Sequence, residues 1–317
     1  MHPAFSVIFF TVTSGAGYAL MGLLALLNFL YLGMLIDKST FFIISSISVI
    51  LFTIGLVSST FHLANPKNAW RAFMRFRTSW LAREGLLAII FYPILFLYLY
   101  FVFIDYQIEN FMFMQMYSCF ILFLSLLIIY CTGMIYACLK TIPQWNTFWT
   151  PVNYITIGLF LGSLLLFLLL ILNNYNVEQY KLHLIVIIIT ALTTKLIYYF
   201  NIRSPKHNIG QATNAAIKLK NTSVRLLDVG HTGGTFLTDE FGFKVKEKKL
   251  LRIKLFSIFC GFFAPLILIC IYCYLYEDVL LCFFAFILAF LGMIAERWLF
   301  FAQAKHVVNL YHGSQNV

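Results

Sequence analysis

Eight long apolar stretches dominate this sequence, and their length is the feature that most constrains the fold. An α-helix needs ~20 apolar residues to cross the ~30 Å hydrocarbon core of a bilayer. Because 62% of the 317 residues are hydrophobic and only 11% are charged, no water-soluble core could bury this much apolar side chain. The sequence therefore predicts an all-α, polytopic membrane protein. We expect eight transmembrane helices in one bundle, forming a single domain over residues 1–317.

The expected spans follow the apolar runs. The first run is much longer than the ~7–15-residue core of a cleavable signal peptide, and no basic segment precedes it. We therefore expect it to remain as a membrane helix. The eight predicted spans are Phe5–Ile36, Phe41–Phe61, Gly85–Ile104, Phe111–Leu139, Val152–Leu172, Leu182–Phe200, Leu250–Leu275 and Val279–Phe300.

Positive charge lies almost entirely on one side of these spans. With eight spans, both termini and the loops after the second, fourth and sixth spans share a side. That side carries every one of the 22 Lys and Arg residues except Lys38 and Lys181. The positive-inside rule places it in the cytoplasm, so the sequence predicts cytoplasmic N- and C-termini. Because topogenesis accounts for the net charge of +10, the charge does not indicate nucleic-acid binding.

Residues 62–84 form the first of two informative loops on this side. Asn65 and Pro66 are typical of a helix start. Apolar residues then recur at helical spacing, with basic residues on another face, which predicts an amphipathic helix lying at the membrane interface. The apolar set is Trp70, Phe73, Met74 and Leu81, and the basic set is Lys67, Arg71 and Arg75. Ser79 is positioned to cap the third span, with Arg83 and Glu84 at its mouth.

The second loop, residues 201–249, is long for a connection between helices, and long loops are usually functional or disordered. It combines basic residues with apolar segments at 224–227 and 236–243, which favours ordering against a partner over pure disorder. We expect partner docking to use basic and polar residues of both loops. The predicted docking residues are Lys67, Arg75, Arg225, His231 and Lys244.

Histidines and cysteines argue against a redox centre within this chain. None of the seven His residues lies deep in a span, whereas membrane haem needs facing histidines inside the bundle, and their scatter also disfavours zinc. All seven Cys residues lie within spans, and no closely spaced run could hold an iron–sulfur cluster. We expect neither haem nor an iron–sulfur cluster here. The histidines are residues 2, 62, 183, 207, 231, 306 and 312.

The mouth of the third span has the residue types of a quinone site. His62 and Glu84 fall at similar depth, and either could carry the protons that accompany two electrons. Aromatic rings can stack on the quinone ring, and basic residues can donate to its carbonyls. The predicted quinone-site residues are His62, Glu84, Arg71, Arg77, Trp70 and Trp80. On chemistry alone, the alternative that these residues only anchor the helix end at the headgroups is favoured.

Other notable residues receive structural interpretations. Lys195 is expected to extend its amine toward the interface, and Glu296 and Arg297 to form an ion pair near a helix end. The small residues 14–17 in the first span are typical of close helix packing.

Four stretches of the sequence together resemble a known family. They are MHPAFSVIFFTVTSGAGY at the start, SSTFHLANPKNAWRAFMRFRTSWLAREG in the first loop, VRLLDVGHTGGTFLTDEFGF in the second and ERWLFFAQAKHVVNLY near the end. In order and along nearly the whole chain, they are similar to the DmsC family. Its members are membrane-anchor subunits of dimethyl-sulfoxide-reductase-type molybdoenzymes.

The resemblance implies an eight-helix anchor without haem in a bacterial inner membrane. It implies two partners, an iron–sulfur electron-transfer subunit and a molybdopterin catalytic subunit, and exchange of electrons with ubiquinone or menaquinone. The family's quinol site uses a His ending the second helix and a Glu beginning the third, which correspond to His62 and Glu84. This reverses the preference for headgroup anchoring. Relatives usually have Gly and a basic residue where this chain has Ala64 and Asn65, a difference that concerns the detail of the loop.

Orientation distinguishes branches of the family. Classical members hold their catalytic subunits on the periplasmic side, whereas the SoeC branch serves a cytoplasmic sulfite dehydrogenase. The cytoplasmic assignment of the basic loops favours that branch, with electrons passing from sulfite to quinone. The alternatives are a dimethyl sulfoxide or related reductase anchor oxidising menaquinol, and an anchor without a quinone site. A transporter would need inverted repeats and mid-membrane ionisable residues, which the sequence does not show.

Overall fold

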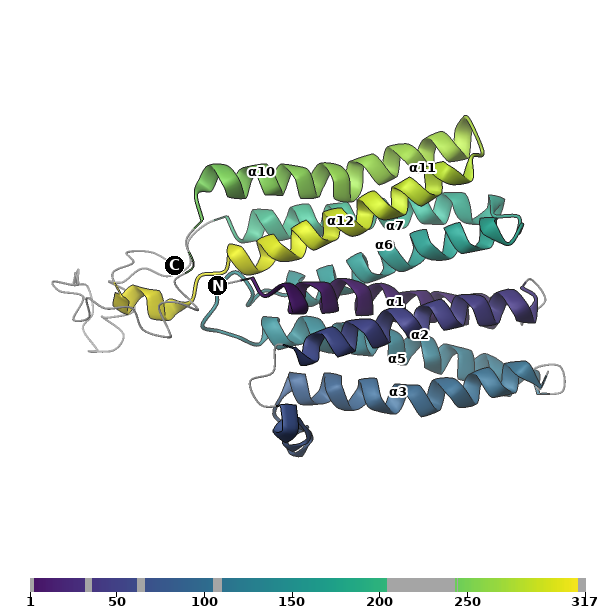
Figure 1. The fold of residues 1–317 in the computed structure, drawn as a ribbon, viewed down its shortest axis with the longest axis horizontal. Coiled ribbons are helices and arrows are strands. Elements are labelled where there is room, and N and C mark those ends of the chain that lie inside the picture. Colours follow the sequence, from purple (N-terminus) through teal and green to yellow (C-terminus); the bar gives the residue numbers. More distant parts are fainter. Residues whose placement is uncertain are drawn as a thin grey trace.

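The structure is a computed structural model that describes residues 3–31, 36–61, 66–104, 110–203, 243 and 245–312. In this part of the chain, eight helices are long and apolar enough to cross a membrane, and they pack side by side as one bundle (Figure 1). The all-α prediction with eight spans is confirmed. The protein is therefore a multi-pass membrane protein, and its orientation in the membrane stays a prediction.

The helices begin and end close to the expected bounds. The seventh span, Glu247–Tyr274, is continuous through α10, a π-helical turn η2 and α11. The elements are α1 (Phe5–Tyr31), α2 (Lys38–Thr60), η1 (Pro66–Arg75), α3 (Trp80–Phe103), α5 (Phe111–Ala137), α6 (Trp149–Leu172), α7 (Glu178–Asn201), α10 (Glu247–Ile258), η2 (Phe259–Phe263), α11 (Ala264–Tyr274), α12 (Val279–Ala302) and η3 (Val307–His312).

Five helices begin three to five residues before the expected bounds, and the third and seventh spans show why. The third span begins at Trp80 instead of Gly85, because Ser79 caps α3 by accepting a hydrogen bond from the backbone N–H of Ala82. The seventh begins at Glu247 instead of Leu250, so part of the basic run assigned to the second loop is already helical. Polar residues at a helix end do not prevent helix formation when water or headgroups surround them.

The start of α1 and the end of η3, which are the first and last described elements, lie at the same end of the bundle (Figure 1). We call this the terminal end; it holds the first residues of α1, α3, α6 and α10 and the last residues of α2, α5, α7 and α12. The opposite end is the distal end. The prediction that both termini share a side with the loops at 62–84 and 201–249 follows from this arrangement of helices.

Helix α1 occupies the centre of the bundle, where small residues let its neighbours approach closely. A methyl group on Gly17 would lie 2.7 Å from the backbone nitrogen of Phe52 in α2, and one on Gly55 would lie 2.9 Å from that of Ser14. The Ser48 hydroxyl donates to the Gly17 carbonyl at 2.8 Å. The interpretation of residues 14–17 as a helix-packing segment is confirmed.

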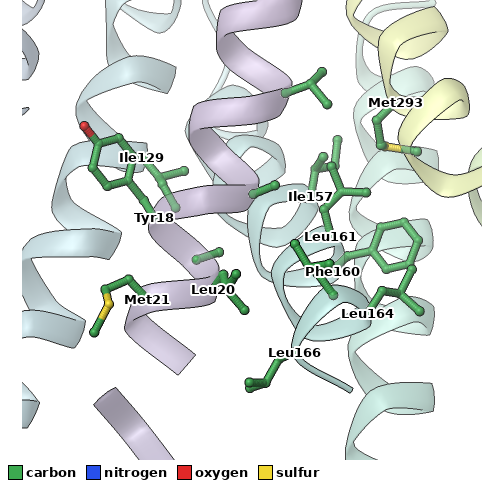
Figure 2. Packing of buried hydrophobic residues seen from close by; sticks show 14 of the residues in the cluster. Tyr18, Leu20, Met21, Ile129, Ile157, Phe160, Leu161, Leu164, Leu166 and Met293 are labelled. Atoms are coloured by element: carbon green, nitrogen blue, oxygen red, sulfur yellow. The ribbon is translucent and has the colours of Figure 1, made fainter. Parts of the chain in front are cut away.

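On its other faces, α1 packs against α5 and α6 through large apolar side chains. In Figure 2, Tyr18 and Met21 extend from the side of α1 where Ile129 of α5 lies, and Leu161 of α6 lies on the other side of α1. Because lipid is as apolar as these side chains, close van der Waals packing rather than hydrophobic burial holds such helices together.

Polar contacts join elements at the distal end. The carboxylate of Asp37 caps α2 through the backbone N–H of Thr40 and accepts a hydrogen bond from Tyr175 in the α6–α7 loop. These hydrogen bonds and one from Ser39 hold the pKa of Asp37 well below its ordinary value. Lys181 donates to Glu178 at 2.5 Å and to Glu277 at 2.7 Å, which ties α7 to the loop before α12.

Among the described glycines, those where α12 crosses η2 make the closest helix contact. A methyl group on Gly292 would lie 2.2 Å from the Cα atom of Gly261, so backbone would have to move. We predict that Gly292→Ala lowers the stability of the purified protein by about 1–3 kcal/mol through overpacking. The measurement is thermal denaturation in mild detergent.

The control for this prediction is Gly15→Ala, because a methyl group there meets nothing closer than 4.0 Å. Both glycines are helical, so the change in helix propensity is the same for both. Equal melting temperatures for the two variants would contradict a close contact at Gly292.

Candidate functional site

Glu84 is a buried carboxylate one turn inside the terminal end of α3. Ser79 fixes the start of the helix, and this register turns Glu84 toward the bundle, where it is only 4% exposed. Its Oε1 atom has no hydrogen-bond partner among the residues that the structure describes. A buried, unpaired carboxyl group is costly, which marks this position as a functional candidate.

The surroundings of Glu84 come from α1 and α5. Tyr18, Cys131 and Tyr136 lie within electrostatic range of its carboxyl group. Nearby, the Trp80 ring meets Tyr130 edge-on at 5.9 Å. The carboxyl group is therefore buried near aromatic side chains of α1, α3 and α5, a setting in which an uncharged ring could lie against aromatic faces.

The interfacial segment before α3 is a 3₁₀ helix, η1, instead of the expected longer amphipathic helix. It ends at Arg75, a turn covers residues 76–78, and Leu81 belongs to α3. Phe73 packs toward α3, since its ring would lie 3.4 Å from a methyl group on Gly85. Trp70 is 55% exposed, and the Arg71 guanidinium lies 5.9 Å from its ring. The segment therefore presents aromatic and basic side chains outward, as its pattern predicts.

Arg83 holds the turn between η1 and α3, a role that the sequence analysis did not assign. Its guanidinium donates to the carbonyl of Phe76 at 3.0 Å and to that of Arg77 at 2.7 Å. The same group lies 4.3 Å from the Trp80 ring. These contacts fix the turn directly above Glu84. The pairing of Arg83 with Trp80, three residues apart, is the signal that sequence could have given.

The predicted site residues fall into three groups. Glu84 is buried and Trp80 half-buried, and they lie on the same first turns of α3. Five predicted residues are exposed in η1 and the following turn, namely Lys67, Trp70, Arg71, Arg75 and Arg77. The predicted roles of four further residues stay predictions, because these residues lie outside the described part of the chain: His62, Arg225, His231 and Lys244.

A second buried charged cluster lies at the terminal end, between α7 and α12. The Glu296 carboxylate forms ion pairs with the Lys195 amine and, at 3.0 Å, with Nε of Arg297. All three side chains are at most 2% exposed. Arg297 also lies 3.8 Å from the Tyr154 ring, and Lys195 lies 4.1 Å from the Tyr198 ring.

This cluster corrects one expectation and extends another. Lys195 does not extend to the interface, because the buried Glu296 carboxylate and the Tyr198 ring hold its amine inside the bundle. The expected Glu296–Arg297 ion pair is confirmed, but it belongs to a fully buried trio. No group of three His, Cys, Asp or Glu side chains in the described part of the chain could hold a metal ion.

We predict that Arg83→Gln loosens the turn at residues 76–78, because two carbonyl partners are lost. In unsealed membrane fragments, chymotrypsin should cleave after Phe76 several-fold faster than in the unchanged protein. Lys67→Gln, an exposed change in the same segment that breaks no described hydrogen bond, is the control. Equal cleavage rates would show that Arg83 does not hold the turn.

Comparisons with known proteins agree with this architecture. The family model described as "DMSO reductase anchor subunit (DmsC)" matches residues 1–303. The chain is also 32% identical, over 337 aligned positions, to a sulfite dehydrogenase subunit of Allochromatium vinosum, covering 99% of each chain. A match over almost the full length includes the mouth of α3 and the buried trio. The chain therefore belongs to the DMSO reductase anchor subunit (DmsC) family and is a membrane anchor of a molybdoenzyme complex.

Proposed function

We propose that this chain is the quinone-reactive anchor subunit of a sulfite dehydrogenase. Electrons from sulfite pass through a molybdopterin catalytic subunit and an iron–sulfur subunit to a quinone held near Glu84. The observation that carries the quinone site is the buried Glu84 carboxyl group, with one oxygen lacking a described partner. Family membership supplies the class of complex, with its catalytic and electron-transfer partners.

The residues present fit a quinone head group. Bound quinone takes up two electrons and two protons as it is reduced. Glu84 can donate a proton to a carbonyl oxygen, since its Oε1 is directed into the bundle without a described partner. Arg83 and Ser79 fix the register of α3 and so orient the carboxyl group. His62 is proposed as the second proton carrier, following its correspondence to the family's histidine.

Two observations support sulfite over another substrate. The relative that matches the whole chain is named for sulfite dehydrogenase. In addition, the basic residues of the terminal end predict that partners dock in the cytoplasm. The second candidate is a reductase anchor that oxidises menaquinol, which the description of the matching family favours. The two differ in the direction of electron flow and in the side on which the termini lie.

We predict that Glu84→Gln lowers sulfite-dependent reduction of a quinone analogue by about 100-fold or more, because a positioned proton donor is removed. The assay uses the complex purified in mild detergent with its partner subunits. Glu247→Gln, an exposed carboxylate change at the terminal end of α10, is the control and should keep the normal rate.

Three other outcomes would each change the proposal. Quinol-driven reduction of dimethyl sulfoxide, without sulfite activity, would replace the substrate and reverse the electron flow. Full activity in Glu84→Gln would remove the quinone site from α3. Purification without any molybdenum or iron–sulfur subunit would contradict the function as an anchor.

The exposed basic face of η1 supplies a second prediction, about docking. Lys67 and Arg75 are exposed at the terminal end, where they can attract acidic residues of an iron–sulfur subunit. Lys67→Glu with Arg75→Glu should release that subunit at a several-fold lower salt concentration during washing of the immobilised complex. The control is Lys181→Gln at the distal end, which should leave retention unchanged. Unchanged retention in the double variant would exclude η1 from the interface.

A further inference from the structure

Lys254 is a half-buried lysine of α10 that lies beside α7 near the terminal end. Helix α10 packs against α12 and α7 against α6, and the Lys254 amine joins α10 to α7 by lying 3.9 Å from the centre of the Tyr199 ring. Lys254 is seven residues after the start of α10, so its backbone is roughly 10 Å inside the terminal end. Because helical side chains tilt toward the N-terminus of their helix, the amine extends back toward that end.

Two lysines contact the Tyr199 ring, and they differ in their acidic partners. The Lys195 amine lies 4.6 Å from the ring centre and forms an ion pair with Glu296. The Lys254 amine contacts the same ring but forms no ion pair with a carboxylate in the described part of the chain. A cation that leaves water needs an anion or other polar partner to replace its solvation. Lys254 is therefore in a position to bind an anion from outside the chain.

Further positive charge surrounds Lys254 at this end of the bundle. On α7, the Arg203 backbone N–H donates to the carbonyl of Phe200 at 3.3 Å, so the helical turn continues past the end of the helix. Arg203 is exposed and four residues after Tyr199, which places it one turn closer to the terminal surface on the same face. On α10, residues 246–254 contain a single carboxylate, Glu247, among five cations: Lys246, Lys248, Lys249, Arg252 and Lys254.

Trp298 indicates that these cations lie at the depth of the lipid headgroups. It is half-buried, four residues before the end of α12, and the Lys249 amine lies 5.9 Å from its ring. Tryptophan is enriched where the hydrocarbon core meets the headgroups. The first turns of α10 therefore hold their cations at the level where phospholipids carry their phosphate groups.

Exposed apolar side chains adjoin the cations on both helices. In Figure 1, α10 forms an outer edge of the bundle, where its outward side chains can face lipid. The exposed apolar set is Leu196 and Phe200 of α7 and Leu251, Leu255 and Phe256 of α10. A molecule that satisfies both the cations and this surface carries an anionic head and apolar chains.

We propose that the terminal ends of α7 and α10 form a binding site for an anionic phospholipid. The Lys254 amine and the Arg203 guanidinium bind the phosphate group through charge-assisted hydrogen bonds. Tyr199 holds the Lys254 amine in place, and the acyl chains lie along the exposed apolar side chains. Basic sites between membrane helices recognise anionic headgroups in this way, whereas a zwitterionic lipid adds an ammonium group that the same cations repel.

A lipid fits this surface better than a protein partner does. Leu251 and Leu255 lie on either side of Lys254 along α10 and are more than half exposed, at 57% and 58%. A bilayer covers such side chains, but a protein docked on the terminal surface would have to enter the hydrocarbon core to reach them. The proposal does not depend on the quinone site at Glu84.

Native mass spectrometry of the complex purified in mild detergent tests the site. The probes are phosphatidylglycerol and phosphatidylcholine with identical acyl chains. We expect the first phosphatidylglycerol to bind the unchanged complex about tenfold more tightly than phosphatidylcholine does. Lys254→Gln should reduce this preference to about twofold or less, and Lys254→Arg should retain most of it. Arg203→Gln, an exposed change beyond the end of α7, should lower the preference several-fold.

The matched control is Lys140→Gln, which removes one exposed positive charge at the same end, in the turn after α5. It should keep the full preference. Equal losses in Lys140→Gln and Lys254→Gln would mean that lipid responds only to net charge, and the site would be wrong. Equal affinities of the two lipids for the unchanged complex would also exclude it.

Two further outcomes separate the site from a protein interface and from a folding defect. If Lys254→Gln keeps the lipid preference but releases the iron–sulfur subunit, the cations bind a protein and the lipid site is wrong. If Lys254→Gln does not assemble, Arg203→Gln decides the matter, because an unchanged preference in that variant contradicts a phosphate held by both helices.

Discussion

A charged side chain that leaves water loses several kcal/mol of solvation unless partners replace the water, and the layout of this bundle reflects that cost. Among the described residues, the buried charged side chains are Glu84, Lys195, Glu296 and Arg297. All four lie within about two turns of the terminal end. Three form ion pairs with one another, whereas Glu84 forms no ion pair among the described residues. This difference makes Glu84 the candidate for binding a ligand.

Close packing around α1 makes this placement possible. Gly17 and Gly55 allow α1 and α2 to approach closely, and the contact between Gly261 and Gly292 does the same for η2 and α12. With the backbones fixed in this way, the inner side chains have little freedom to move. This packing therefore holds the carboxyl group of Glu84 and the tyrosines of α5 and α6 at defined depths in the bundle.

In the proposed function, the anchor contributes proton chemistry to a complex whose substrate chemistry belongs to other subunits. In that proposal, aromatic side chains near the mouth of α3 hold the quinone ring, and Glu84 supplies a proton. The η1 segment lies at the same end and presents Lys67 and Arg75 outward. In the proposed function, the partner therefore delivers electrons at the mouth of α3, where Glu84 supplies a proton.

The sequence by itself determined the eight spans and the shared side of the basic loops, because helix length and charge asymmetry are local properties of the chain. It also proposed Glu84 as a site residue through the family resemblance, and that role stays a prediction. The position of Ser79 just before the third span also predicted that it caps this helix. By contrast, Lys195 is about one hundred residues from Glu296 in sequence, so no spacing rule connects them. Only the tertiary structure, in which α7 and α12 both pack on α6, places Lys195 beside Glu296 as a buried ion-pair partner.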